Sequence, residues 1–396
     1  MPFVVYLFAL SAFALGLAEF VPIGLAHAIA RGLQVGVGQA GSAVTLYALG
    51  ATFAAPVLSA VTAGWPRRRA VLAAMLAFAA GSLAAALAPD LASMQAARFV
   101  AGMGHGLFLA VASAAAAQLA GDAKAGRAVA VVFAGFTAAM AIGVPVGAYI
   151  GETISWRLVL AAIAACGGVG CAGLLWGMKA QPATDAARGA GSAGRALKTL
   201  LHPALLAATA VTVLAYAGSF SAYTYVAPLL LDTTGVDVRA VGMYMLAYGL
   251  FAAIGNALGG RLTDSLGVQR ASVAIVAGIG AASLGMWAGA RSPVAMGVAV
   301  AALGLFTYAA VPALQARLMG IARLRAPQAQ GVAAGLNIAG FNSGIALGAW
   351  AGGLTLGLSG VARVGLAGGL LALLGLALLL WQARTPVSVA DECLNE

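Results

Sequence analysis

Three ionisable side chains lie inside long apolar stretches, where their types and spacing favour proton chemistry over hydrolysis. Glu19 lies in GLAEFVPIGLAHAIA (16–30), which contains no other acid and no lysine or arginine. Arg98 and His105 lie in ARFVAGMGHGLFL (97–109), and their separation of seven residues places them on one face of a helix. Ionisable groups inside membrane spans are costly, so each of the three is a candidate functional residue.

Glu19 is the acid for which this argument is strongest, because the other ten of the 11 acids fall in polar segments or at helix ends. A rise of about 1.5 Å per residue places Glu19 and Arg98 at similar depths. We therefore expect an ion pair or a water-bridged pair between them. The pair has three interpretations: Glu19 couples protons to transport, the pair statically joins two helices, or Glu19 binds a cationic substrate.

The two histidines of these stretches receive different predictions. His105 is either a member of a proton relay or a packed histidine hydrogen-bonded to a neighbouring helix. His27 lies near the outer end of the first apolar run and is rotated away from Glu19, so we expect an interfacial residue.

The elements that carry these residues are membrane-spanning helices. Of the 396 residues, 62% are hydrophobic and 8% charged, and the mean hydropathy is +0.99. Ordinary soluble domains carry about 25% charged residues, so a soluble enzyme is excluded. The pattern predicts an all-α polytopic membrane protein with twelve transmembrane helices in two six-helix pseudo-repeats. The spans lie near 3–30, 39–63, 70–89, 92–119, 127–151, 156–178, 204–231, 239–263, 269–290, 293–319, 328–356 and 360–383.

The longest polar interruption divides the chain into two halves. It predicts an N-terminal six-helix bundle (1–178), a cytoplasmic linker (179–203), a C-terminal six-helix bundle (204–383) and a cytoplasmic tail (384–396). A shift of 201 positions aligns Tyr47 with Tyr248 and the glycine triplet of 143–151 with that of 344–352. Such a parallel repeat predicts a substrate site between the halves, near the membrane midplane.

The net charge of +10 indicates topology rather than nucleic-acid binding. Of the 21 lysines and arginines, Arg98 lies inside a span and five lie in odd-numbered loops, which leaves fifteen for the even-numbered loops and the tail. The positive-inside rule therefore places both termini in the cytoplasm. The five are Arg31, Arg157, Arg239, Arg291 and Arg363.

Two motifs carry a family resemblance. GGRLTDSLGVQR (259–270) has the glycine, acid and basic positions of a known interspan loop, at Gly260, Asp264, Gly267 and Arg270. GVPVGAYIG (143–151) is close to a span-five motif of antiporters, with Gly143, Pro145 and Gly147. The chain resembles the major facilitator superfamily and, within it, the twelve-span drug:proton antiporters similar to bacterial arabinose, purine-nucleoside and chloramphenicol efflux pumps.

The sequence also departs from these motifs. The first-half copy of the loop, TAGWPRRR (62–69), has Ala63 in place of the acid, so a charge latch there must use Arg67, Arg68 and Arg69 alone. The alternative is that these arginines only set the topology. In the first span, the family's proline and acid are replaced by His27 and Ala28.

Aromatic and amide groups in the later spans are the substrate-binding candidates. Aromatic faces with a few hydrogen-bonding groups suit amphipathic or planar molecules. The candidates are Tyr216, Ser219, Tyr223, Asn256, Tyr308, Asn337 and Asn342.

The resemblance implies a proton-coupled antiporter that exports small drug-, nucleoside- or sugar-like molecules by alternating access across a bacterial inner membrane. Its expected partners are that substrate, protons and the lipid bilayer, without nucleic acid, and the expected state is a monomer. No motif for a cofactor, a metal or enzymatic catalysis is present. The alternatives are a nutrient-uptake symporter or facilitator of the same fold, and a transport-inactive membrane sensor or scaffold.

Overall fold

The structure is a computed structural model that describes residues 2–62, 64–120, 125–178, 201–325 and 330–384. These residues form helices and short connections, and they contain no strand. Most of the expected linker (179–203) and nearly all of the expected tail (384–396) lie outside the described residues.

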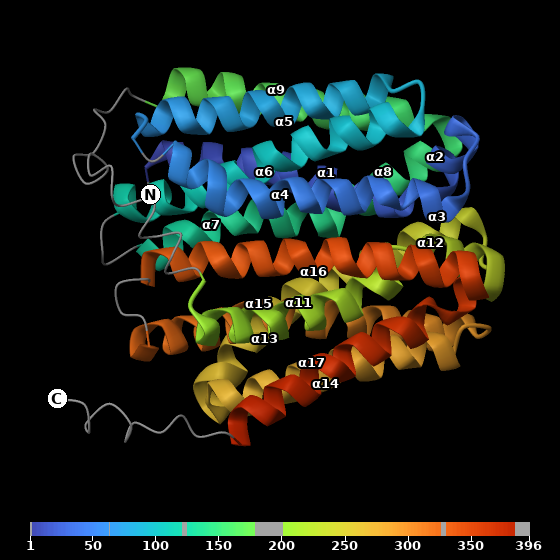
Figure 1. Ribbon diagram of the computed structural model, residues 1–396. Coiled ribbons are helices and arrows are strands. Elements are labelled where there is room, and N and C mark those ends of the chain that lie inside the picture. Colours follow the sequence, from blue (N-terminus) through green and yellow to red (C-terminus); the bar gives the residue numbers. More distant parts are fainter. Residues whose placement is uncertain (1, 63, 121–124, 179–200, 326–329, 385–396) are drawn as a thin grey trace.

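The first group of helices fills one side of the molecule, blue to green in Figure 1. It contains long helices and several short elements. They are α1 (Phe3–Gly24), α2 (Ala26–Leu33), α3 (Val37–Ala40), α4 (Ser42–Val61), α5 (Arg67–Leu87), α6 (Leu91–Ala120), α7 (Ala125–Ala138), η2 (Ala139–Gly143), α8 (Val144–Ile150), η3 (Gly151–Ser155) and α9 (Trp156–Gly177).

The second group fills the other side, yellow-green to red in Figure 1. Its members are α11 (Pro203–Tyr223), α12 (Val226–Pro228), η5 (Leu229–Thr234), α13 (Val238–Leu266), α14 (Val268–Ala288), α15 (Pro293–Arg325), α16 (Gln330–Ser359), η7 (Val361–Arg363) and α17 (Val364–Arg384).

The helices are long and apolar enough for a multi-span membrane protein. Ten stretches of the described residues meet the length and hydropathy that a membrane span needs. One of them, Val131–Gly177, has 47 residues and contains two spans, which separate at Ser155, where the backbone is extended. The apolar 30-residue helix α16 is additional to the ten. The described helices are therefore consistent with the expected twelve spans.

Spans one and seven are not single helices, in contrast to the prediction. In the first span, α1 ends at Gly24, two residues after Pro22, and α2 starts at Ala26. In the seventh, the break at Tyr225 precedes Pro228. Proline lacks an N–H donor and its ring clashes with the preceding turn, which accounts for the break before Pro228, whereas in span one the helix continues through Pro22 and breaks after it. The short elements after each break contain His27 in span one and Asp232 in span seven, and the break changes the direction of both side chains from that in a continuous helix.

The aligned glycine triplets perform the same packing role in both halves. In 143–151 the glycines face α1 side chains so closely that a Cβ on Gly143 would lie 2.0 Å from Leu17 Cδ2. In 344–352 they face α11, and a Cβ on Gly348 would lie 2.6 Å from the Ala217 carbonyl oxygen. Span five thus packs on span one as span eleven packs on span seven, which supports the parallel repeat.

The two ends of the bundle differ. We call the end formed by α2, α3, α12 and η5 the distal end, on the right in Figure 1. The proximal end is the one at which α1 begins and α17 ends. Between the groups, α4 packs against α16, and α13 packs against η2 and α8. These two seams enclose the candidate site.

Candidate functional site

A cavity of about 530 Å³ lies between the two helix groups. Its lining comes from α1, α6 and α7 on one side and from α11, α13, α15 and α16 on the other. The polar residues of the lining are Glu19, His105, Ser113, Thr137, Tyr216, Asn256, Tyr308, Gln315 and Asn342. A volume of this size is typical of sites for small organic molecules.

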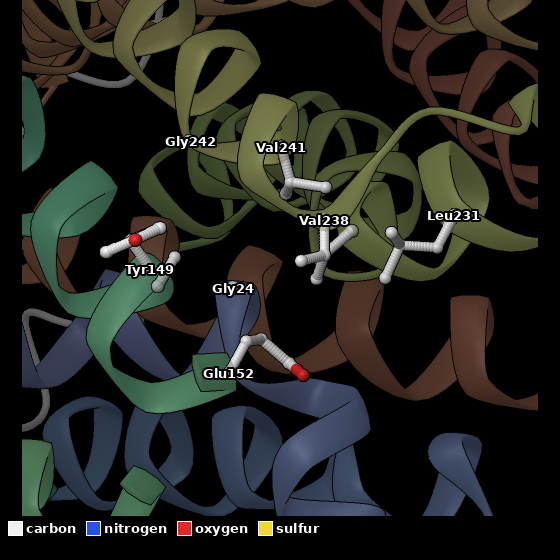
Figure 2. A pocket seen from close by; sticks show the side chains of 9 residues that line it. Gly24, Tyr149, Glu152, Leu231, Val238, Val241 and Gly242 are labelled. Carbon is white, nitrogen blue, oxygen red and sulfur yellow. The ribbon is translucent and has the colours of Figure 1, made fainter. Parts of the chain in front are cut away.

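The cavity lies in the middle and proximal parts of the bundle, because the two groups touch at the distal end. There the Tyr225 hydroxyl approaches the Gly38 carbonyl oxygen at 3.5 Å, and a Cβ on Gly38 would lie 3.3 Å from the Gly353 carbonyl oxygen. Figure 2 shows a second part of this seam, where Glu152 and Tyr149 face Val238 and Val241 around a pocket of only about 10 Å³. The distal end is closed in this conformation.

Glu19 and His105 meet at the cavity wall. Glu19 comes from the last third of α1 and His105 from the middle of α6, and both side chains are almost fully buried. Glu19 Oε2 lies 3.7 Å from His105 Nδ1. The arrangement places a carboxyl group and an imidazole beside each other in a site that a small molecule can fill.

Arg98 does not form a direct ion pair with Glu19, so that form of the expected pair is wrong, and the water-bridged form stays a prediction. No ion pair within 4 Å joins these two residues. The Arg98 guanidinium lies over the Tyr47 ring, 4.1 Å from its centroid, and its Nε donates to the Ala43 carbonyl oxygen at 3.2 Å. Stacking on an aromatic face stabilises a buried cation. The Arg98 side chain, which comes from α6, is thereby held against α4, behind the cavity wall.

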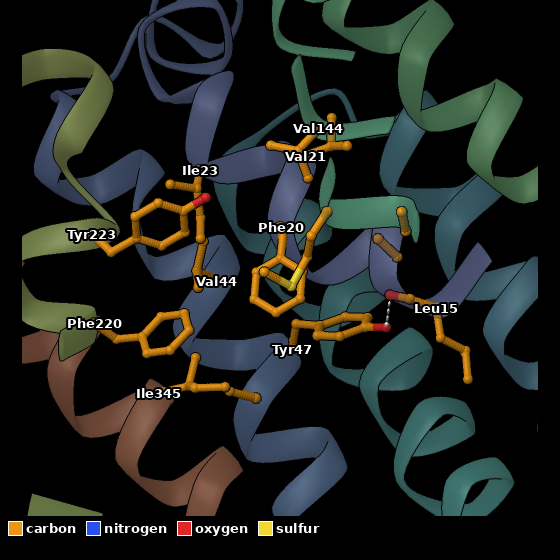
Figure 3. Packing of buried hydrophobic residues seen from close by; sticks show 14 of the residues in the cluster. Leu15, Phe20, Val21, Ile23, Val44, Tyr47, Val144, Phe220, Tyr223 and Ile345 are labelled. Carbon is orange, nitrogen blue, oxygen red and sulfur yellow. Dashed lines mark hydrogen bonds between the residues drawn. The ribbon is translucent and has the colours of Figure 1, made fainter. Parts of the chain in front are cut away.

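Tyr47, which the sequence reasoning did not select, links these groups. Its hydroxyl lies 2.9 Å from His105 Nδ1 and 3.4 Å from the Leu15 carbonyl oxygen. Figure 3 shows the bond to Leu15 among the packed side chains. His105 is therefore hydrogen-bonded to a neighbouring helix and also lines the cavity, and its part in a proton relay stays a prediction.

Close packing of α4 on α6 positions this network. A Cβ on Gly102 would lie 1.9 Å from the Tyr47 carbonyl oxygen, and one on Gly50 would lie 2.2 Å from the Phe99 carbonyl oxygen. Only glycine permits such an approach of two backbones. It brings the Tyr47 ring between Arg98 and His105.

Aromatic rings form the apolar part of the wall. The Phe20 ring lies 5.5 Å from Phe136 in its own group, and 6.2 Å from Phe220 and 6.5 Å from Tyr308 across the cavity. Figure 3 shows Phe20 and Phe220 facing each other from the two groups. The cavity thus offers flat apolar surfaces with few polar atoms between them.

The substrate candidates from the sequence divide into two sets. Tyr216, Asn256, Tyr308 and Asn342 line the cavity. Ser219 is instead bonded to the Thr307 hydroxyl at 2.6 Å, and Tyr223 stacks on Tyr248 at a centroid distance of 3.7 Å.

Asn337 also belongs to the second set and lies behind the wall. It donates to Gln315 Oε1 and accepts from the Thr212 hydroxyl at 3.4 Å. Gln315, which lines the cavity, was missed because a glutamine near the end of a span suggests an interface.

The loop-motif residues lie at the proximal end, as expected. Arg68 donates to the Leu175 carbonyl oxygen at 2.5 Å, which ties α5 to α9. Asp264 is exposed and forms no ion pair with any described residue. Gly267 has φ +79°, which explains the glycine of the motif. The latch that the resemblance implies is therefore not engaged with a described residue in this conformation.

His27 has a role that the sequence did not indicate. Its Nε2 lies 3.2 Å from Asp232 Oδ2, so the broken tip of span one contacts the broken tip of span seven. The same tip also contacts Glu152 of η3, which accepts from the Ala28 N–H at 2.9 Å and pairs with Arg31 at 2.6 Å. His27 is thus a contact between the two helix groups rather than only an interfacial residue.

Comparison with known proteins identifies the family. The sequence model described as Major Facilitator Superfamily matches residues 8–325 and 209–392. The chain belongs to the major facilitator superfamily. A crystal structure of a mutant peptide transporter POT with alafosfalin has the same fold, with a TM-score of 0.76, 14% identity and coverage of 97% of this chain and 95% of that one.

Two superfamily relatives are similar over most of their length. The inner membrane transport protein YdhP of Escherichia coli (strain K12) is 33% identical over 384 residues, or 95% of each chain. A chloramphenicol resistance protein of Streptomyces lividans is 34% identical over 361 residues, or 90% of each chain. This superfamily member is therefore a multi-span membrane transporter of a small molecule and not an enzyme. Among the described residues, no group of acids, histidines and cysteines could hold a metal ion.

Proposed function

We propose that this chain exports small organic molecules from a bacterial cell in exchange for protons, by alternating access. The observation that carries the proposal is Glu19, a buried acid that lines the central cavity beside His105. A carboxyl group in that position can bind either a proton or a substrate group that replaces it. The similarity to a chloramphenicol resistance protein supports export of a drug-like molecule.

The two helix groups are the proposed moving bodies, joined by the linker 179–203. With both termini in the cytoplasm, the closed distal end faces outward and the central cavity belongs to an inward-facing state. Substrate would enter from the cytoplasm, the proximal ends would approach, and the contacts between the span-one and span-seven tips would separate. A proton from outside would then return on Glu19.

Everted membrane vesicles test this proposal. Respiration acidifies their lumen, and addition of chloramphenicol, inosine or arabinose should release protons from it if the added compound is exchanged. A lumenal pH dye reports that release. Export by antiport predicts alkalinisation with at least one compound and none in vesicles without the protein. Nutrient symport predicts no alkalinisation with any compound, and that result would contradict the proposal.

A further inference from the structure

Two buried polar atoms of the cavity wall, Ser113 Oγ and Asn342 Oδ1, have no hydrogen-bond partner among the described residues, and the Asn342 oxygen is the one that can only accept. Asn342 is 5% exposed and lines the cavity from α16. Its Oδ1 is buried and receives no hydrogen bond from any described residue. A buried acceptor of this kind costs free energy unless a donor reaches it.

The orientation of the Asn342 amide follows from its other contact. Its Nδ2 donates at 3.0 Å to the Ile338 carbonyl oxygen, one turn earlier on the same helix. Because a carbonyl oxygen can only accept, the amide nitrogen must face Ile338 and the amide oxygen must point away from it. The side chain is thus fixed as an acceptor.

The charge of the lining restricts the molecule that can supply the donor. No lysine or arginine is among the described residues that line the cavity, whereas Glu19 is. Arg98, the basic residue nearest in the sequence to His105, is held on the Tyr47 ring. An anion would lose its hydration in this cavity and find no cation in return.

The apolar lining restricts the molecule further. Rings from both groups surround the space, with Phe341, the neighbour of Asn342, 4.7 Å from Tyr216 and Phe20 6.2 Å from Phe220. Such walls favour a flat or aromatic body. The volume of about 530 Å³ accommodates a molecule of drug or nucleoside size.

We infer that Asn342 Oδ1 is a specificity-determining acceptor, and that the cavity takes an aromatic, non-anionic molecule whose hydroxyl group donates to it. The inference rests on the proposed export function and adds the chemistry of its substrate. It selects for donors, because a substrate without one would leave the acceptor buried and unpaired.

Equilibrium binding to the purified full chain tests this inference without a proton gradient. The probes are chloramphenicol and inosine, each paired with its fully O-acetylated form, and anionic chloramphenicol succinate. We expect at least one parent compound to bind about tenfold more tightly than its acetylated form, and chloramphenicol succinate not to bind. If neither parent compound binds, or if acetylation has no effect, the inference is overturned.

Two variants assign the effect to Asn342. In Asn342→Leu, which keeps the size of the side chain, the preference for the parent compound should disappear. In Thr355→Val, a change on the same helix at a hydroxyl bonded within that helix, it should persist. Thermal unfolding of both variants checks their folding. An unaltered preference in folded Asn342→Leu would overturn the inference. If Asn342→Leu does not fold, Asn342→Gln, which keeps the acceptor but moves it, should show a reduced preference for the parent compound, and an undiminished preference there would overturn the inference. Failure of proton exchange in vesicles would leave this binding result intact, so the two proposals fail separately.

Discussion

Glu19 Oε2 lies 3.7 Å from His105 Nδ1, and both side chains line the same cavity. The pair joins α1 to α6 and faces aromatic rings of the second helix group, so a molecule bound there touches both halves and the acid at once. Because both side chains are almost fully buried, the charge state of Glu19 depends strongly on what occupies the cavity. This dependence is the physical basis for exchanging a proton against a substrate.

Removal of the Tyr47 hydroxyl should impair transport without abolishing substrate binding. Tyr47→Phe keeps the ring under Arg98 but removes the bonds to His105 and Leu15, and Tyr47 does not line the cavity. We expect a stability loss of about 1 kcal/mol, a lower transport rate and an unchanged substrate affinity. Tyr6→Phe, at an exposed tyrosine, is the control. A transport rate in Tyr47→Phe equal to that of the wild type would show that the hydroxyl has no part in coupling.

A methyl group at Gly102 should destabilise the first helix group. Its Cβ would lie 1.9 Å from the Tyr47 carbonyl oxygen, so α4 and α6 must separate. Gly168→Ala, on α9 with no atom within 4 Å of the added Cβ, is the matched control and should be neutral or stabilising by up to about 1 kcal/mol. Thermal unfolding in detergent measures both. Equal unfolding temperatures for the two variants would contradict the close packing.

Cross-linking of the distal tips should stop transport. His27 and Asp232 belong to different helix groups and are in contact. In a cysteine-free background, His27→Cys with Asp232→Cys should be joined by a short thiol cross-linker, and substrate export should fall to background and recover after reduction of a cleavable linker. His27→Cys alone controls for the reagent. Full transport by the cross-linked protein would exclude separation of these tips as a step in the cycle.

The start of α6 should lose stability in acid. The Ser93 backbone N–H donates to Asp90 Oδ1 at 2.8 Å, and with the Ser93 hydroxyl it holds the pKa of Asp90 below its usual range. A carboxyl group with a lowered pKa stabilises the folded state above its unfolded value, about pH 4, and that contribution vanishes as the pH falls through the folded value. Asp90→Ala should therefore unfold earlier than wild type at pH 7 and together with it at low pH. A difference that persists undiminished in acid would refute this.

Much of the architecture followed from composition and periodicity. Long apolar runs, the position of 179–203 and the aligned glycines were sufficient for the fold class and the repeat, because each is a local property of the chain. The breaks at Leu25 and Tyr225 were not predicted, since Pro22 and Pro228 stand in stretches of otherwise unbroken hydropathy. As a result, the contact between His27 and Asp232 could not be foreseen.

The partner of Glu19 shows the limit of such reasoning within the site. The estimate from helical rise matched Arg98 with Glu19, but in the structure Arg98 lies over Tyr47, and His105, seven residues further along α6, lies beside the acid. Tyr47 appeared in the repeat alignment only as a position matched with Tyr248, because a tyrosine in a span usually serves packing. Its link to His105 depends on the approach of two backbones at Gly102, which no pattern in one helix reveals.

Purified protein in liposomes with a lumenal pH dye tests the central claim most directly. A gradient of a transported substrate should drive protons in the opposite direction in wild type and in Asp90→Asn, which changes an exposed carboxyl group and keeps the helix cap. In Glu19→Gln the proton flux should be absent, while exchange of labelled for unlabelled substrate continues and confirms a folded transporter. Undiminished substrate-driven proton flux in Glu19→Gln would contradict the account.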